Sequence, residues 1–514
     1  MCLSLKILRS TAMTESLIWW SIAIYLLIAI GIAIMSRQGP SESMSGYFLG
    51  NRQMNGFVSA LSYSATTYSA FMMVGLAGLT YAGGVGALGF EIIYFAGVSL
   101  VAVFGPKFWA VGKKFGYVTP SEMLGHRYNS KHVAMAVSIA SCIFLIPYSA
   151  VQLAGVGYLL QGITDGAITF TTGVVLATVI AIFFSYIAGI RSVMWTDSLQ
   201  AIMMIVASTL VAFLVIQGLG GFGALFDTLA TEHPQSLTVP GPGLFSFVTF
   251  LGLTIPWFFF SISNPQVSQR LFMPSSLRSM RHMLIGFLVF GFIYTMVSVL
   301  WGFSALAAFP SLASADLATP TLLASEFVPP VLGVIVMIGI MAAAVSTIDS
   351  IMLTLASMVS RDVYANVKPN VSEKRQLLVG KFVVPVIALM ALAFAELQLD
   401  LIAVLSVAAS SGLVAMVPAL IGAFYWKRGT GVGALVSVVG TSAFVLLMYA
   451  TGNSLLGLPA GVWGIVVASV LFVGVSLATK PHQATTDAFF AAISEELSKK
   501  RSTTTDQATK EAAA

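Results

Sequence analysis

The sequence predicts an all-α integral membrane protein with about 13 transmembrane helices. Only 9% of the 514 residues are charged, whereas soluble domains have about 25%. The mean hydropathy is +0.92. The apolar residues form uninterrupted stretches, such as 16–36 and 331–360, that are long enough to cross a bilayer as helices. The short segments of alternating polarity that are typical of a transmembrane β-barrel are missing from the sequence.

Apolar stretches define the predicted spans in chain order. We expect the first to be kept as an anchor, because no small-residue cleavage site follows a short apolar core. The predicted spans lie at about residues 17–36, 57–80, 87–106, 132–161, 167–188, 194–218, 244–270, 283–306, 329–360, 377–395, 399–426, 431–451 and 459–479. The chain therefore divides into an N-terminal extension (1–16), a transmembrane domain (17–479) and a polar tail (480–514).

The charges of the loops predict the orientation of the chain. Short cytoplasmic loops are enriched in Lys and Arg. One set of loops holds nearly all of these residues, Arg127, Arg270 and Arg361 among them, whereas the opposite set holds only acids. The N-terminus is therefore predicted outside, and the C-terminus inside, the plasma (inner) membrane of the cell. Lys6 and Arg9 break this rule, and a translation start at Met13 would remove them.

The tail after residue 480 is rich in Ser, Thr, Lys and Glu. This composition is typical of a cytoplasmic and partly disordered segment. A short amphipathic helix is predicted around Phe489 to Leu497.

Two polar runs interrupt apolar spans. The second span contains Ser-Tyr-Ser-Ala-Thr-Thr-Tyr-Ser at 62–69, and the seventh contains Ser-Ile-Ser-Asn-Pro-Gln at 261–266. Such hydroxyl groups often bond only to their own helix or to a neighbouring one. The two runs, however, lie five spans apart, which predicts an inverted repeat of five-helix units at about 57–218 and 244–426 with a broken helix at the start of each.

Three carboxylates lie within predicted spans, where burial of a charge is expensive. Asp197 is close to the start of its span and is either functional or a helix N-cap. Asp349 and Ser350 follow Ser346 by three and four residues, which places all three on one helix face. Glu91 is interpreted as a solute contact, a gate or an interfacial acid. Hydroxyl groups beside one carboxylate suit a hard cation such as Na+.

These motifs resemble the sodium:solute symporter family, which includes sodium/proline, sodium/glucose, pantothenate and monocarboxylate cotransporters. The resemblance covers about residues 17–479. Its motifs here are Ala343 to Thr347, Trp195-Thr196-Asp197 with Gln200, Pro265-Gln266 with Gln269-Arg270, and Trp426-Lys427-Arg428 with Gly433-Ala434 and Gly440. The resemblance implies a LeuT-type fold and Na+ as the coupling ion.

The family's sodium site lies between the second and ninth spans. The residues that match its ligands are Ala65, Tyr68 and Ala343 through their carbonyls and Ser346 and Thr347 through their hydroxyls, with Asp197 in support. Some relatives bind a further cation deeper, at positions that match Ser346, Asp349 and Ser350. The aspartate departs from the expected hydroxyl pattern, which leaves a second Na+, a proton or a structural hydrogen bond open.

The resemblance also implies a solute site between the two broken helices. The predicted contacts are Ser64, Thr67, Ser69, Glu91, Gln152, Trp257, Phe260, Ser261, Asn264 and Gln266. Thr67 stands where sodium/proline relatives have an aspartate. A neutral, hydroxyl-lined site favours a small organic carboxylate, either a monocarboxylate or a pantothenate-like solute, over a sugar, although Glu91 argues the other way.

Other classes of function find little support in the sequence. The two cysteines, Cys2 and Cys142, and five scattered histidines form no metal-site pattern. No nucleotide-binding loop or nucleophile with its base is present, so we expect no enzyme activity. The basic residues are spread over loops, which predicts no nucleic-acid partner. A proton-coupled, proline-like symporter and a symporter-like solute sensor are the alternatives, and the oligomeric state is not predicted.

Overall fold

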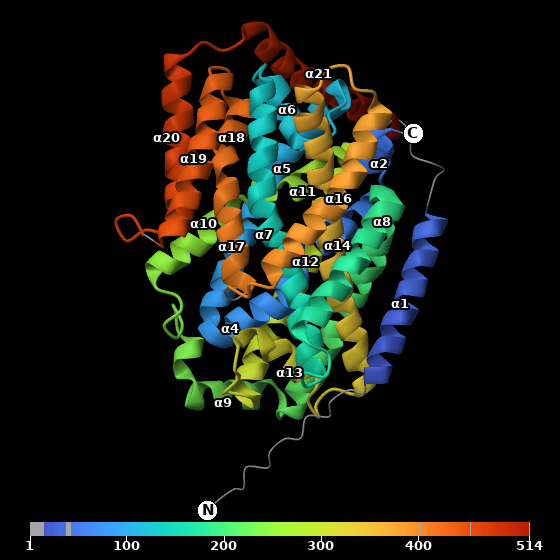
Figure 1. Cartoon of the computed structure of the whole chain (residues 1–514), viewed down its shortest axis with the longest axis vertical. Coiled ribbons are helices and arrows are strands. Elements are labelled where there is room, and N and C mark those ends of the chain that lie inside the picture. The colour runs from blue at the N-terminus through green and yellow to red at the C-terminus, as the bar shows by residue number, and fades with distance from the viewer. Residues whose placement is uncertain (1–14, 37–42, 400–401, 453, 513–514) are drawn as a thin grey trace, which may run out of the picture.

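The computed structural model describes residues 15–36, 43–399, 402–452 and 454–512. Within these ranges the elements are helices, with no strand beyond isolated bridges. Most of the helices run along the long axis of the molecule (Figure 1). The all-α fold class is therefore confirmed. The predicted N-terminal extension with Lys6, Arg9 and Met13 lies almost wholly outside the described residues.

Eleven of the described helices are long and apolar enough to cross a membrane. They are α1 (Glu15–Met35), α5 (Val85–Phe115), α7 (Lys131–Ile163), the second part of α8 (Phe170–Gly218), α10 (Phe247–Ser263) with its continuation, α12 (Leu277–Ala308), α14 (Pro330–Met358), α16 (Glu373–Ala395), α17 (Ile402–Leu413) with α18 (Val417–Tyr425), α19 (Gly431–Thr451) and α20 (Ala460–Ala478). Two further predicted spans coincide with shorter apolar helices at Phe71–Gly83 and Phe170–Ser185. The count of 13 stays a prediction.

Both predicted helix breaks are present. Helix α3 (Gly56–Thr67) ends at Tyr68, whose φ and ψ of −93° and 81° leave the helical region, and the chain resumes as a π-helical turn, η2 (Phe71–Leu76), followed by α4 (Ala77–Gly83). Helix α10 ends at Asn264, whose φ and ψ are −85° and 114°. Pro265 then begins the short helix α11 (Pro265–Ser268), a position where its missing amide hydrogen costs nothing.

Helix α8 corrects one interpretation of Asp197. The sequence analysis ends one span at 188 and begins the next at 194, which would place Asp197 in the first turn of a helix. In the structure α8 is kinked at Gly189, at φ 63° and ψ 170°, and its second part begins there, five residues before the predicted start. Asp197 therefore lies about two turns inside the helix, and the N-cap alternative is wrong.

Glycines bring the broken helices into close contact with their neighbours. At Gly97 of α5 an added Cβ would overlap the carbonyl of Phe258 in α10. At Gly291 of α12 it would overlap the hydroxyl of Tyr68, whose ring stacks on Phe287 with centroids 5.0 Å apart. Helix α5 is thus closely packed on α10, and α12 on α3.

The tail is more helical than predicted. The expected amphipathic helix is part of α21 (Gln483–Ala512), which lies across the upper end of the molecule in Figure 1. Phe489 is fully buried, and its ring stacks on Phe115. An ion pair of 2.9 Å joins Lys427 to Asp487 and holds the pKa of this carboxyl below its ordinary value. The tail is therefore docked on the transmembrane domain.

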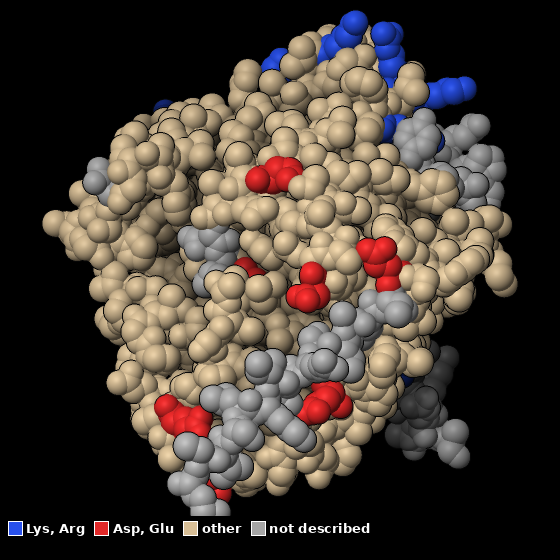
Figure 2. All heavy atoms as spheres, turned by 60° about the horizontal axis from the view of Figure 1, so that its bottom comes forward, with Lys and Arg blue, Asp and Glu red and all other residues tan. Residues whose placement is uncertain are grey.

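Charges separate between the two ends of the molecule, as the loops predict. Figure 2 looks at the end that carries α9 (Gly221–Glu232) and α13 (Ala318–Leu323), where acidic side chains are scattered and Lys and Arg gather at the far margin. Which end faces the cytoplasm stays a prediction. Two residues assigned to loops are buried instead, namely Arg127 at 1% exposure and Arg270 at 2%.

Candidate functional site

The break in the second span faces the hydroxyl groups of α14. The Ser346 hydroxyl lies 3.3 Å from the carbonyl oxygen of Ala65 and 3.4 Å from that of Ala343. The Thr347 hydroxyl lies 3.4 Å from the Ala65 oxygen and 3.1 Å from the Thr66 oxygen. The structure thus brings four of the five predicted sodium ligands together and adds the Thr66 carbonyl, which the sequence analysis did not single out.

The spacing of these oxygens suits a cation. Ligands at right angles around an ion with bonds of about 2.3–2.6 Å, as for Ca2+, lie about 3.3–3.7 Å apart, and Na+ has a similar radius. For Tyr68, the fifth predicted ligand, the structure shows that α3 ends there and that the ring packs against α12. The oxygens of the cluster belong to carbonyl and hydroxyl groups and are neutral. A cation can therefore bind there without a carboxylate among its direct ligands.

A buried ion pair supports this cluster from behind. Asp197 accepts a hydrogen bond of 2.6 Å from Ser62 and pairs with Arg270 at 3.4 Å, with both charged side chains almost fully buried. The Ser346 hydroxyl also interacts with the Asp197 carboxylate. Arg270 donates further hydrogen bonds of 2.6 Å to Ser62 and Ser350.

Sequence reasoning placed Arg270 in a loop and missed this role. The available signal was its position five residues after Pro265 in a span that also contains a break, because a helix that restarts inside the bilayer carries the residues after it into the protein.

The proposed second cation position is occupied by side-chain contacts. Ser350 accepts from Arg270 and lies 3.2 Å from the Thr66 hydroxyl, while Asp349 accepts a hydrogen bond of 2.8 Å from Ser185 in α8. Both residues are buried. The guanidinium group of Arg270 already brings one positive charge to this region.

The break in the seventh span differs in its hydrogen bonding. The side-chain amides of Asn264, Gln266 and, on α7, Gln152 are buried, and none has a hydrogen-bond partner among the described residues. The hydroxyl of Ser263 also has none. Unpaired buried polar groups are expensive, so such a set indicates a place where a polar ligand completes the hydrogen bonds.

The predicted hydroxyl contacts are mostly satisfied by the protein itself. Ser64 and Thr67 donate to carbonyls one turn back in α3, at 2.8 and 2.7 Å. Ser261 donates to the Gly97 carbonyl at 3.0 Å, and Ser69 accepts from the Phe71 amide at 3.2 Å. For Ser64 and Thr67 the structure therefore agrees with the alternative that these hydroxyls bond to their own helix.

Glu91 lies in an aromatic environment. Its exposure is only 1%, which is too low for an interfacial acid, and its carboxylate accepts one long hydrogen bond of 3.4 Å from the indole of Trp257. The Trp257 ring centroid lies 4.7 Å from that of Phe260. These three predicted solute contacts are therefore neighbours.

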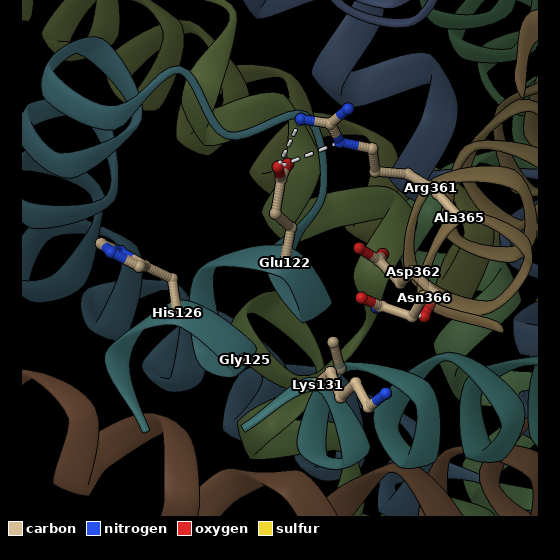
Figure 3. A pocket seen from close by; sticks show the side chains of 9 residues that line it. Glu122, Gly125, His126, Lys131, Arg361, Asp362, Ala365 and Asn366 are labelled. Carbon is tan, nitrogen blue, oxygen red and sulfur yellow. Dashed lines mark hydrogen bonds and ion pairs between the residues drawn. The ribbon is translucent and has the colours of Figure 1, made fainter. Parts of the chain in front are cut away.

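A polar pocket of about 290 Å³ opens at the α21 end of the molecule (Figure 3). Arg361 pairs there with Glu122 at 2.9 Å, and buried Asp362 accepts hydrogen bonds of 2.6 Å from Thr119 and Ser121. The pocket lies about four turns along α14 and its π-helical extension, η6 (Val359–Tyr364), from Thr347. It is thus separate from the oxygen cluster.

Helices broken at midspan, with an oxygen cluster at one break and unpaired amides at the other, define a secondary transporter. The model of the sodium:solute symporter family matches residues 47–440, and the chain belongs to this family. Na+ is accordingly the coupling ion and the protein is a multi-pass membrane protein.

Several known proteins are similar to the chain. It is 28% identical to the sodium/pantothenate symporter of Haemophilus influenzae over 434 residues, which cover 82% of this chain and 89% of that protein. It is 26% identical to a sodium/proline symporter of Staphylococcus aureus over 485 residues, covering 89% and 92%. Among solved structures, a Na+-coupled sialic acid symporter has a TM-score of 0.75 at 19% identity, covering 91% of this chain and 98% of that one, which supports the LeuT-type fold.

Proposed function

We propose that the protein carries a small organic carboxylate into the cell together with Na+ by alternating access. The observation that carries the proposal is the set of oxygens from Ala65, Thr66, Ala343, Ser346 and Thr347 at the first break. Na+ bound there would hold α3 to α14. The solute would then bind beside the ion, at the breaks of the two helices.

The hydrogen-bond donors at the second break support a solute with a carboxylate group. The amide groups of Asn264, Gln266 and Gln152 are unpaired and can donate to an anionic oxygen. A pantothenate symporter among the relatives is consistent with such a solute. The driving force depends on the net charge that is moved. One Na+ gains about 2.3 kcal/mol from 100 mV and about 1.4 kcal/mol from a tenfold gradient, but a singly charged carboxylate cancels the first contribution, so a one-to-one cycle supports about tenfold accumulation.

The contacts of Asp349 favour a structural role. Its carboxylate accepts a hydrogen bond from Ser185, and Arg270 donates a hydrogen bond to Ser350, the next residue in the chain. Repulsion between Arg270 and a further cation disfavours a second Na+ at Asp349 and Ser350. We therefore propose one Na+ per cycle.

Uptake into proteoliposomes tests the coupling. The panel contains pantothenate, short monocarboxylates, proline and a hexose, with and without an inward Na+ gradient at fixed pH. Accumulation of a carboxylate only with Na+ is expected. Uptake that follows a proton gradient instead would favour the proton-coupled alternative, and binding without uptake would favour the sensor.

Two substitutions test the ion site. Ser346→Ala or Thr347→Ala removes one oxygen from the cluster, so the Na+ concentration for half-maximal uptake should rise about tenfold or more, as for loss of about 1.4 kcal/mol. Solute affinity at saturating Na+ should change much less. Ser138→Ala is the matched control, because that buried hydroxyl bonds only to its own helix, at the Ala134 carbonyl. Equal losses in Na+ and solute affinity would contradict the assignment.

A further inference from the structure

Glu91 is a buried carboxylate that the proposed ion site does not use. It lies in α5 inside a predicted span, and none of the ion pairs in the described part of the chain includes it. Its hydrogen bond from the Trp257 indole is 3.4 Å long. A buried carboxylate is expensive unless a positive charge or several donors satisfy it. Asp197, buried to the same degree, has an arginine and a serine.

Aromatic rings pack around Trp257, the residue that donates to Glu91. The Trp257 ring centroid lies 4.9 Å from that of Phe71, 5.5 Å from Phe90 and 5.7 Å from Tyr94. Tyr94 stands one turn after Glu91 on α5, and its hydroxyl has no hydrogen-bond partner among the described residues. The faces of Trp, Tyr and Phe attract cations, above all an ammonium that has left water. A carboxylate beside this aromatic wall provides the matching negative charge.

The wall is continuous with the unpaired amides of the second break. Phe260 packs on Trp257 and, with centroids 5.8 Å apart, on Tyr148. One helical turn beyond Phe260 lies Asn264, and one turn beyond Tyr148 lies Gln152. The two ends of this wall therefore differ in chemistry. One end offers an anion and aromatic faces, and the other offers neutral amide donors and acceptors.

We infer that the solute carries a positively charged ammonium group, bound by Glu91 and the rings around Trp257, in addition to its carboxylate. The inference rests on the proposed function and narrows its solute to a small zwitterion. The ammonium replaces its lost hydration by the Glu91 carboxylate and the Trp257 face, while the solute carboxylate accepts from the amides of Gln152, Asn264 and Gln266. A solute with only a carboxylate would leave Glu91 unpaired and would bind poorly.

Matched pairs of solutes test this inference in the purified full-length protein. Each pair differs only in whether nitrogen or oxygen stands at one position: proline and tetrahydrofuran-2-carboxylate, alanine and lactate, 4-aminobutyrate and 4-hydroxybutyrate. We would measure the rise in melting temperature as a function of solute concentration, once in Na+ buffer and once in K+ buffer. At least one amine should stabilise the protein at a concentration ten or more times lower than its oxygen partner. An equal or better effect of the oxygen partners, or no effect of any amine, would overturn the inference.

The same measurement separates this inference from the proposed coupling. If Na+ alone stabilises the protein but no amine does, the ion site stands and the ammonium site falls. If an amine stabilises equally in Na+ and K+, the ammonium site stands and the proposed Na+ coupling falls.

Glu91→Gln provides the decisive variant, since it keeps the shape and removes the charge. The preference for amine over oxygen partner should fall at least tenfold, while stabilisation by Na+ alone, which reports a folded protein, stays as in the wild type. Glu326→Gln is the matched control, because Glu326 is an exposed acid in the segment between α13 and α14. A Glu91→Gln protein that is stabilised by Na+ and keeps the full amine preference would overturn the inference.

Discussion

The two broken helices have similar backbones but opposite hydrogen bonding. At the first break, the carbonyls of Ala65 and Thr66 face the hydroxyls of Ser346 and Thr347, and Ser64 and Thr67 bond within their own helix. At the second break, Asn264 and Gln266 have buried amides with no partner among the described residues. The polar groups at the first break are paired within the protein, whereas the amides at the second break are unpaired.

Under the proposed function, this difference separates the ion site from the solute site. An ion as small as Na+ needs a few oxygens held at fixed spacing, and a second helix can hold them there whether or not the ion is bound. A solute needs donors and acceptors that the protein leaves unpaired, and their desolvation cost is offset only when the solute binds. Unpaired amides therefore identify the solute end better than the number of hydroxyls does.

Arg270 gives the largest expected effect, because it joins the two breaks. It follows the second break in sequence but bonds to Ser62 behind the first and to Ser350 in α14. Arg270→Met should lower the free energy of unfolding by about 3–5 kcal/mol, since it leaves Asp197 buried and unpaired. Reversible unfolding in mixed micelles measures this.

A double variant provides the control for that prediction. Arg270→Met combined with Asp197→Asn removes both charges, so part of the lost stability should return. A double variant that loses the sum of the two single effects would show that the ion pair is not the reason for the loss.

At the second break we expect an effect of intermediate size, in which substitutions raise the free energy of unfolding. Asn264→Leu and Gln266→Met remove unpaired amides and keep the volume, so the free energy of unfolding should rise by about 1 kcal/mol. Solute affinity should fall at least tenfold, with the Na+ dependence of stability unchanged. Thermal unfolding with and without solute measures both. A loss of stability would mean that the amides are paired in the absence of solute.

The smallest effect is expected at Ser64 and Thr67. Their hydroxyls donate to carbonyls of their own helix, so Ser64→Ala and Thr67→Val should change solute affinity by less than about twofold, a few tenths of a kcal/mol. Competition with a labelled solute in proteoliposomes measures this. A tenfold loss would show that these hydroxyls turn toward the solute during the cycle, and the contrast between the breaks would then weaken.

Eleven of the spans and both breaks could be predicted from the sequence, because apolar length, a polar run and a proline in an apolar stretch act locally. The approach of Ser346 and Thr347 to Ala65 also agrees with the motif. The burial of Arg270 could not be predicted in the same way, since a charge beside a predicted helix end is usually in a loop. Neither could the direction of the Ser64 and Thr67 hydroxyls, because a hydroxyl in a helix can bond backward or outward and only the packed neighbours decide.

The close glycine contacts have a mechanical consequence. At Gly97 the backbones of α5 and α10 are too near to slide without collision, and the contact of Gly291 with Tyr68 couples α12 to α3 in the same manner. Each of these two pairs, α5 with α10 and α12 with α3, should therefore move as one unit in the proposed transport cycle. In the proposed transport cycle, movement is easier at the oxygen contacts between α3 and α14, where bonds of 3.1–3.4 Å can lengthen without any atom having to pass through another.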